Sequence, residues 1–230
     1  AQLKSNATHA SYNVGQEHLA LYTALRDALE RLVEVPDNRF AVPHFGRHFD
    51  FVRFCWEKYG VPLNRAVYVD IGCGGMNPYA RMFTHLMTGA SRAYCVDLAP
   101  IRDQGGALRA LAHLARAALI DPHSIFGAYP ITNREILVNL AGFDLAKLAK
   151  GDAVGMNFDR LCFLNTSVST TGLGDVSTDV IVSNSVLEHL PSVDDALAEF
   201  ARITKPGGFG MHGIDVRDHR WYGYPALHPL

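Results

Sequence analysis

Three glycines and one aspartate have the types and spacing needed to bind a ligand. Gly72, Gly74 and Gly75 follow a short apolar run at 66–71. Glycines at such a turn let the backbone approach a ligand closely, and a helix start beyond them offers free N–H groups to an anion. Asp97 ends the next apolar run, where its carboxylate can accept hydrogen bonds from both hydroxyls of a ribose. The pattern predicts a nucleoside-containing ligand; the alternative is a glycine turn that only packs a helix onto a strand.

The glycine loop departs from the dinucleotide-binding fingerprint. The pattern G-x-G-x-x-G would place its third glycine at position 77, where this chain has Asn77. The loop therefore indicates a nucleoside ligand without favouring NAD.

Strands and helices must position these residues. Short apolar runs bounded by turn residues predict five strands, at 66–71, 92–97, 160–165, 179–184 and 209–214. Apolar residues at helical spacing predict helices at 16–34, 49–59, 79–87, 108–119 and 192–204, with one or two more within 133–150. The alternation of strands and helices indicates an α/β fold with a Rossmann-like, mostly parallel sheet flanked by helices.

The chain divides into two expected parts, an N-terminal helical segment at 1–64 and an α/β domain at 65–230. A crossover between adjacent parallel strands needs only about a dozen residues. The stretch 99–158 is therefore an insertion, which we expect to form a lid or a cap facing the substrate.

The helix predicted after the fourth strand has a recognisable start and end. Ser192 and Asp195 fit a capping box, and the stop is expected at Lys205-Pro206-Gly207-Gly208. The expected buried face consists of Ala196, Leu197, Phe200 and Ile203.

Composition narrows the class of protein. The 230 residues carry a net charge of −2, which offers no basic surface for nucleic acid. No apolar run is long enough to span a bilayer, so we expect no membrane partner. The four cysteines are widely spaced and contain no C-x-x-C pair, which argues against a zinc site or a disulfide framework and favours the cytoplasm.

Three motifs in order resemble those of the class I S-adenosylmethionine-dependent methyltransferases, in particular the type 11-like group. VDIGCGG resembles the first motif of that family and AYCVDL the second, and DVIVSNSVLEHLPSVDDALAEFARITKPGG resembles its later motifs. The resemblance covers about residues 70–215 apart from the insertion. It implies a methyltransferase that uses S-adenosylmethionine and releases S-adenosylhomocysteine.

The resemblance also implies roles for single residues. Gly72 and Gly74 would let the backbone pass the amino-acid portion of the cofactor, with Asp70 near its ammonium group. Asp97 would bind the ribose hydroxyls. The remaining implied contacts are Ser167 and Val168 near the adenine, and Asn184 and Ser185 beside the methionine portion and the reacting methyl group. In many members an acidic residue stands where this chain has Ser167 and Val168, and a glycine where it has Met76.

Histidines at the carboxyl ends of the fourth and fifth strands are the candidates for a general base, because open α/β sheets bind ligands at that edge. His219 is the preferred catalytic base, and the alternative is a surface or capping histidine. His189 is a second candidate, although the E-H pair to which it belongs favours a structural role, with Glu188 bonding to backbone or helix groups. His212 is expected to be a satisfied core histidine. His212, Asp215 and His219 complete no established metal motif, and we expect no metal.

We expect the acceptor to be a small molecule methylated at oxygen. One alternative is an NAD-dependent oxidoreductase or nucleotide-sugar enzyme, and another is a cofactor-binding module without catalysis. Self-association into a homodimer stays open. Sixteen residues, 215–230, follow the fifth strand. The family sheet continues with a helix and two strands, for which sixteen residues are too few, so we expect the C-terminal strands to be missing.

Overall fold

The computed structural model describes residues 49, 54, 57–58 and 64–216. All of them belong to a compact unit at Phe40–Leu230. The described residues within 49–59 are helical, and the rest of the predicted helical segment 1–64 lies outside the described residues. The same is true of 217–230, so the expectation that the C-terminal strands are missing stays a prediction.

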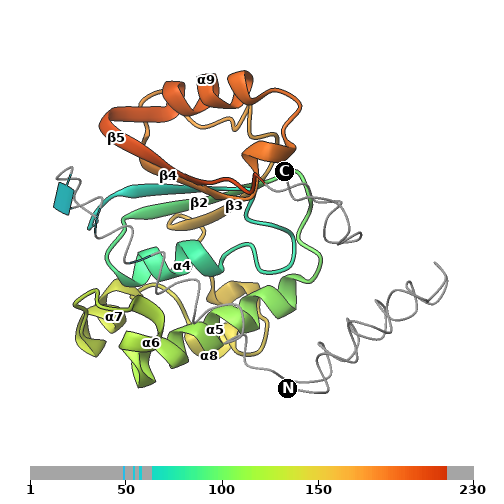
Figure 1. Cartoon of the computed structure of the whole chain (residues 1–230). Coiled ribbons are helices and arrows are strands. Elements are labelled where there is room, and N and C mark those ends of the chain that lie inside the picture. Colours follow the sequence, from blue (N-terminus) through green and yellow to red (C-terminus); the bar gives the residue numbers. More distant parts are fainter. Residues whose placement is uncertain (1–48, 50–53, 55–56, 59–63, 217–230) are drawn as a thin grey trace, which may run out of the picture. The chain divides into compact units, whose positions relative to one another are not determined.

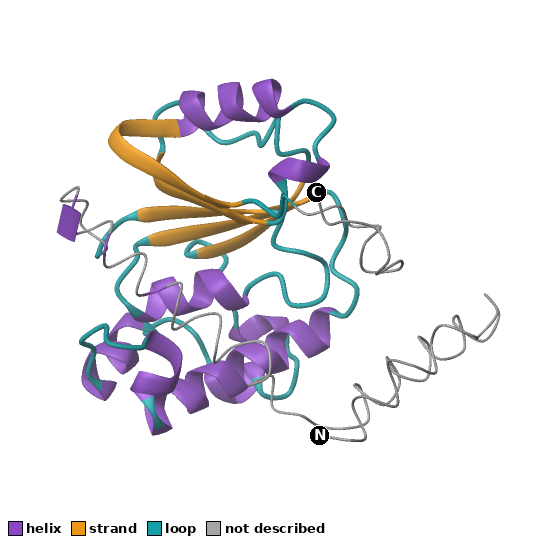
Figure 2. Ribbon diagram, in the orientation of Figure 1, coloured by secondary structure: helices purple, strands orange, loops and turns teal. Residues whose placement is uncertain are grey.

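A five-stranded parallel sheet forms the centre of the domain (Figure 2). Its strands are β1 (Val67–Ile71), β2 (Arg92–Asp97), β3 (Leu161–Asn165), β4 (Thr178–Asn184) and β5 (Thr204–Gly213). They lie in the order β3-β2-β1-β4-β5, and each neighbouring pair is parallel. The predicted Rossmann-like α/β fold is confirmed, and all five predicted strands are present.

Strand β1 lies in the middle of the sheet, and its apolar side chains are buried on both faces. Tyr68 belongs to one hydrophobic cluster, while Val69 and Ile71 belong to another on the opposite side. At the start of β1, the Val67 backbone N–H donates to Asp179 Oδ2 of β4 at 2.7 Å, across 112 positions of sequence. The order reverses between β1 and β4, and sheets of this type bind ligands outside the carboxyl ends of the strands at such a reversal.

Helices cover both faces of the sheet (Figure 1). One face carries the helices α4 (Ala80–Met87), α5 (Gln104–Ile120), α6 (Pro122–Phe126), α7 (Asn133–Asn139) and α8 (Leu145–Leu148), with a 3-10 turn at Ala153–Gly155. The other face carries α9 (Val193–Ile203), preceded by a 3-10 turn at Leu187–His189. None of the helices in the described part of the chain is long and apolar enough to cross a membrane.

The long connection between β2 and β3 contains α5 to α8 and is part of the core. Leu108, Leu111 and Phe126 are fully buried in the same cluster as α4. The Arg160 guanidinium donates to the carbonyl oxygens of Asn139 and Ala90, which ties α7 to the start of β2. Helix α6 was not predicted; Asp121 caps it and Pro122 occupies its first turn. A role for this insertion as a lid or cap stays a prediction.

Helix α9 begins as predicted, because Ser192 Oγ accepts a hydrogen bond from the Asp195 backbone N–H at 3.2 Å. Ala196, Phe200 and Ile203 are buried, but Leu197 is 45% exposed, so its place in the predicted buried face was wrong. Glu199 is buried in its stead, because it is fixed to another segment.

Helix α9 ends at Ile203, next to the predicted stop at 205–208, but the fifth strand begins earlier than the predicted residue 209. Strand β5 begins at Thr204, immediately after α9, and contains these residues. Thr204 lies opposite Thr178, and Phe209 lies opposite Val180. A step of five residues along β5 therefore corresponds to a step of two residues along β4. The extra residues are accommodated by a bulge, in which Gly207 has a φ of +83°.

Candidate cofactor site

The loop between β1 and α4 needs glycine at two positions. Gly72 and Gly74 have φ values of +70° and +77°, in the left-handed region that disfavours side chains. A Cβ atom on Gly72 would lie 2.3 Å from Val186 Cγ2, whereas a Cβ on Gly74 would meet no atom within 4 Å. Gly72 therefore allows close packing against the segment after β4, and Gly74 faces open space.

Gly74 and Asp97 are brought together at the carboxyl ends of β1 and β2. The Gly74 N–H donates to Asp97 Oδ2 at 2.7 Å, and the Ala99 N–H donates to Asp97 Oδ1 at 2.8 Å. Each carboxylate oxygen has a second lone pair with which to accept a hydroxyl hydrogen. The half-buried Asp97 is thus held in a fixed orientation beside the open space at Gly74.

Asp70 is buried behind the glycine loop and pairs with Arg81 of α4. Arg81 Nη1 donates to Asp70 Oδ1 at 2.7 Å, and Asp70 is only 2% exposed. Burial raises the pKa of Asp70 to about 6; the Arg81 charge opposes this rise, and the negative charge of Asp97 adds to it. Sequence reasoning missed Arg81, although a basic residue in the first turn after a glycine loop is a visible signal.

Asn184 and Ser185 lie at the carboxyl end of β4, on the same edge of the sheet as the glycine loop. Both are exposed. Ser185 has a φ of +53°, and its backbone N–H donates to the Gly213 carbonyl oxygen of β5 at 2.8 Å. A Cβ on Gly213 would lie 2.6 Å from Asn184 Oδ1, so β5 leaves room for the Asn184 side chain through its own glycine.

Ser167 and Val168 lie in the loop after β3, which begins beside Asp97. The Thr166 N–H donates to the Asp97 carbonyl oxygen at 3.1 Å. The Ser167 hydroxyl accepts from the Ser169 N–H at 3.3 Å. The Val168 side chain is buried in the hydrophobic cluster beneath α9. A contact from Val168 to the adenine would therefore come from its backbone, and the role of both residues stays a prediction.

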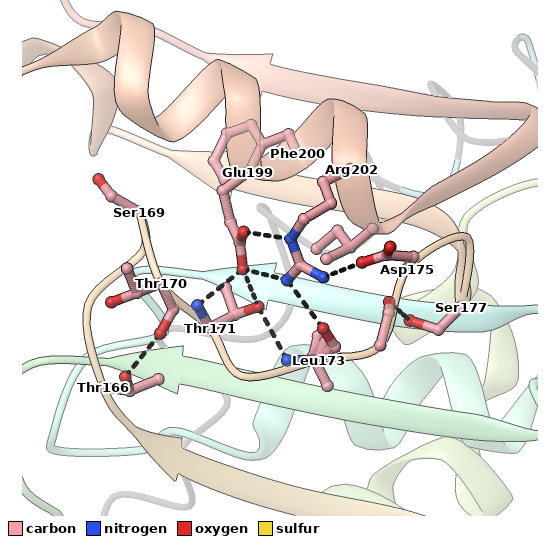
Figure 3. Close-up of polar contacts among 12 residues, drawn as sticks. Thr166, Ser169, Thr170, Thr171, Leu173, Asp175, Ser177, Glu199, Phe200 and Arg202 are labelled. Atoms are coloured by element: carbon pink, nitrogen blue, oxygen red, sulfur yellow. Dashed lines mark hydrogen bonds and ion pairs between the residues drawn. The ribbon is translucent and has the colours of Figure 1, made fainter.

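A clasp of polar side chains fixes this loop to α9 (Figure 3). The Glu199 carboxylate accepts from the Thr171 backbone N–H at 2.8 Å and from the Thr171 hydroxyl at 2.6 Å. Arg202 donates to both Glu199 oxygens at 2.8 Å and also pairs with Asp175. The Arg202 and Thr171 hydrogen bonds lower the pKa of Glu199 to about 2.

The histidines lie in different settings. His212 of β5 is half-buried, its Nδ1 lies 2.8 Å from Ser183 Oγ, and its ring stacks on Phe200 at 5.3 Å. Burial lowers the pKa of His212, which favours a neutral imidazole. It has a hydrogen-bond partner, as predicted, but it is half-buried and does not lie in the core. His189 is exposed in the turn after β4, and His219 lies outside the described residues.

Glu188 carries a structural contact of the kind predicted for it. Its Oε1 accepts a hydrogen bond from the Asp215 backbone N–H at 3.1 Å, which ties the chain after β5 to the turn after β4. Among residues 64–216 and the few described before them, no group of three or more His, Cys, Asp or Glu side chains is arranged to hold a metal ion.

A comparison with protein families finds a match to about a third of the chain. Residues 132–211 match the model of a family described as a methyltransferase domain. This part of the chain is therefore similar to a methyltransferase domain. The matched stretch runs from the insertion through β3, β4 and α9 into β5. S-adenosylmethionine is the cosubstrate that this family implies.

Solved structures similar to this chain include three that are described as putative methyltransferases. A putative S-adenosylmethionine-dependent methyltransferase from Listeria monocytogenes is 13% identical over 71% of this chain and 55% of its own, with a TM-score of 0.37. A putative sarcosine dimethylglycine methyltransferase from Galdieria sulphuraria is 17% identical over 79% and 52%, with a TM-score of 0.43. A putative S-adenosyl-L-methionine-dependent methyltransferase from Methanococcus maripaludis is 17% identical over 82% and 69%, with a TM-score of 0.42.

The chain spans about half the length of the first of these similar structures. A search of curated proteins finds no match to the chain.

Proposed function

We propose that this chain binds S-adenosylmethionine at the carboxyl ends of β1, β2 and β4 and transfers its methyl group to an oxygen atom of a small-molecule acceptor. The observation that carries the proposal is the pairing of Gly74 with Asp97. An open backbone position lies next to a carboxylate that is held for a ribose. The match to the methyltransferase family supports this choice of nucleoside.

The cofactor would lie along the edge of the sheet, with its ribose at Asp97 and its adenine near Ser167 and Val168. Its methionine portion would pass Gly72 and Gly74 toward Asn184 and Ser185, with the ammonium group near Asp70. Methyl transfer is a displacement in which the acceptor oxygen attacks the methyl carbon and the bonding electrons stay on sulfur. Holding donor and acceptor in line can supply much of the rate. The acceptor proton would pass to a base, for which His219 and His189 are the candidates.

A small-molecule acceptor is supported by the net charge of −2, which offers no field that would attract a nucleic acid. The proposal includes neither a membrane partner nor a nucleic acid. The cytoplasm is the proposed location, and a homodimer is compatible with these residues.

Calorimetric titration with S-adenosylmethionine, S-adenosylhomocysteine and NAD tests the binding half. We expect saturable binding of the first two ligands, no binding of NAD, and a loss of about 10- to 100-fold in Asp97→Asn, because hydrogen bonds to a charged group are lost. Asp194→Asn is the matched control, since Asp194 is an exposed residue of α9. Binding of NAD in place of the other two would overturn the proposal in favour of an oxidoreductase.

Release of S-adenosylhomocysteine in the presence of phenol, catechol and sugar acceptors tests the catalytic half. Turnover that falls in His219→Ala or His189→Ala would identify the base. Tight cofactor binding with no turnover on nitrogen, sulfur or oxygen acceptors would instead identify a binding module.

A further inference from the structure

We propose that Arg81 binds the carboxylate of the cofactor's methionine portion and thereby selects cofactors that carry this group. This inference rests on the proposed function, because it assigns a residue to one end of the same ligand. None of the sequence motifs includes Arg81, and it follows from the ion pair behind the glycine loop.

Arg81 is the more exposed residue of this ion pair, and Asp70 is buried. Arg81 lies in the first turn of α4 and contacts Asp70, near the end of β1. The Arg81 side chain is 28% exposed and that of Asp70 only 3%. A ligand that approaches the pair would therefore meet the guanidinium group first.

The Arg81 guanidinium has hydrogen-bond donors that Asp70 does not use. It carries five N–H groups in a planar fork that matches a carboxylate. Among the residues that the structure describes, the Arg81 side chain donates its hydrogen bond from Nη1 to Asp70. Asp70 therefore fixes the orientation of the group while leaving most of its donors for a second anion.

The charge of Arg81 is poorly placed unless an anion is near. The start of a helix carries partial positive charge, which disfavours a cation in the first turn. The first turn of α4 has no acidic residue, and Tyr79 at its N-cap position makes no side-chain hydrogen bond. The negative charge of Asp70 offsets Arg81 from one side, and a ligand carboxylate would offset it from the other.

The location of the pair identifies the part of the cofactor that it would meet. Asp70 lies two residues before Gly72, and the negative charge of Asp97 helps to raise the pKa of its carboxyl group. With the ribose at Asp97, the amino-acid end of the cofactor would extend past the end of β1. An ammonium group near Asp70 and a carboxylate at Arg81 would then match the two charges of the protein with opposite charges.

The alternative is that Arg81 only fastens α4 to β1. The two roles differ in their dependence on the ligand. S-adenosylmethionine and its decarboxylated form have the same sulfonium, ammonium and adenosine groups and differ in the carboxylate. A fastening role would change the affinity for both ligands alike, whereas a binding role would change it for the carboxylated form.

Calorimetric titration of the wild-type protein, Arg81→Met and Arg81→Lys with both ligands tests the inference. We expect the wild-type protein to prefer S-adenosylmethionine over the decarboxylated form by about 10- to 100-fold, as for a charge-assisted bidentate contact. Arg81→Met should abolish this preference without weakening the decarboxylated form. Arg81→Lys should keep part of it, because lysine retains the charge but not the fork.

If Arg81→Met does not fold, the double variant Asp70→Asn/Arg81→Met takes its place in the titrations. The double variant removes both charges and so leaves no buried charge unpaired. Equal wild-type affinity for the two ligands, or equal losses for both in the variants, would overturn the inference while leaving the proposed function intact. Failure of the wild-type protein to bind S-adenosylmethionine, S-adenosylhomocysteine or the decarboxylated form would overturn the proposed function, and the inference with it.

Discussion

Glu199 of α9 holds Thr171, 28 positions earlier in the chain, by two hydrogen bonds to one carboxylate oxygen. One comes from the Thr171 backbone and the other from its hydroxyl group. Because Thr171 lies in the loop after β3, a helix on one face of the sheet fixes the loop that leads away from the candidate adenine contact. The stability of the fold and the shape of this part of the site therefore depend on the same carboxylate.

Removing this carboxylate should strongly destabilise the protein. Glu199→Ala would leave the buried Thr171 donors without their acceptor, while Arg202 keeps Asp175 and the Leu173 carbonyl, so we expect a loss of about 2–3 kcal/mol in the free energy of unfolding. Urea denaturation measures it. Asp175→Ala is the matched control, because Asp175 contacts the same Arg202 but is exposed; it should cost less than about 1 kcal/mol. Similar losses in the two variants would contradict this account of the clasp.

The Glu199 carboxylate should also make the stability of the protein depend on pH. The pKa of Glu199 is lowered to about 2 from an ordinary value of 4.5, so its contribution is complete above that ordinary value and is lost as the pH falls toward 2. This contribution is at most about 3 kcal/mol. The difference in unfolding free energy between wild type and Glu199→Gln should therefore shrink between pH 5 and pH 2. A constant difference across this range would show that the charge of Glu199 does not stabilise the fold.

Alanine at the two loop glycines should separate folding from binding. Gly72→Ala combines a left-handed φ with a Cβ that collides with Val186, so we expect a loss of about 2–5 kcal/mol in stability. Gly74→Ala carries the backbone strain alone, about 1–2 kcal/mol. Its methyl group would occupy the open space in front of the loop, so the affinity for S-adenosylhomocysteine should fall although the protein stays folded. Thermal unfolding and calorimetry on the two variants check this; unchanged affinity in Gly74→Ala would place the cofactor elsewhere.

Cofactor affinity should depend on the protonation of Asp70. With a pKa of about 6, Asp70 is charged at pH 7 and mostly neutral at pH 5, where it no longer attracts the cofactor's ammonium group. Burial is the main cause of this raised pKa; the facing charge of Arg81 opposes it and that of Asp97 adds to it. We expect the affinity for S-adenosylmethionine to fall between pH 7 and pH 5 in wild type and to be weak and flat in Asp70→Asn. The same raised pKa makes the folded state lose stability as pH rises toward 6. Parallel pH profiles in the two proteins would exclude this role of Asp70.

Sequence reasoning predicted the strands because each contains a short apolar run, and in β1 and β4 this run is buried on both faces of the sheet. Val69 and Ile71 contact one helical layer and Tyr68 the other, so the runs end where the sheet ends. The pairing of Gly74 with Asp97 was predictable for the same reason, since parallel strands end at one edge. Local sequence signals were enough to predict those residues whose positions follow from the common direction of the strands.

The errors arose where a distant segment decided the outcome. Leu197 was assigned to the core by its hydrophobicity, but the buried place is taken by Glu199, whose partner Thr171 belongs to another loop. Strand β5 begins at Thr204 rather than at the predicted residue 209, because Thr178 and Val180 of β4 pair on either side of a bulge. Arg81 was missed because its partner Asp70 is identified only when α4 is folded back onto β1.

The strand order has a consequence for how the chain reaches its native state. β1 is completed on one side by β2, which follows it closely, but on the other side by β4, with Tyr68 opposite Val180. That pairing must close a loop of more than a hundred residues before it returns any stabilisation, and such closures slow folding. On a ribosome, the amino-terminal half of the sheet would emerge with one edge of its central strand still unpaired. The cofactor edge, which needs β1, β2 and β4 together, would form only after residue 184 had left the exit tunnel.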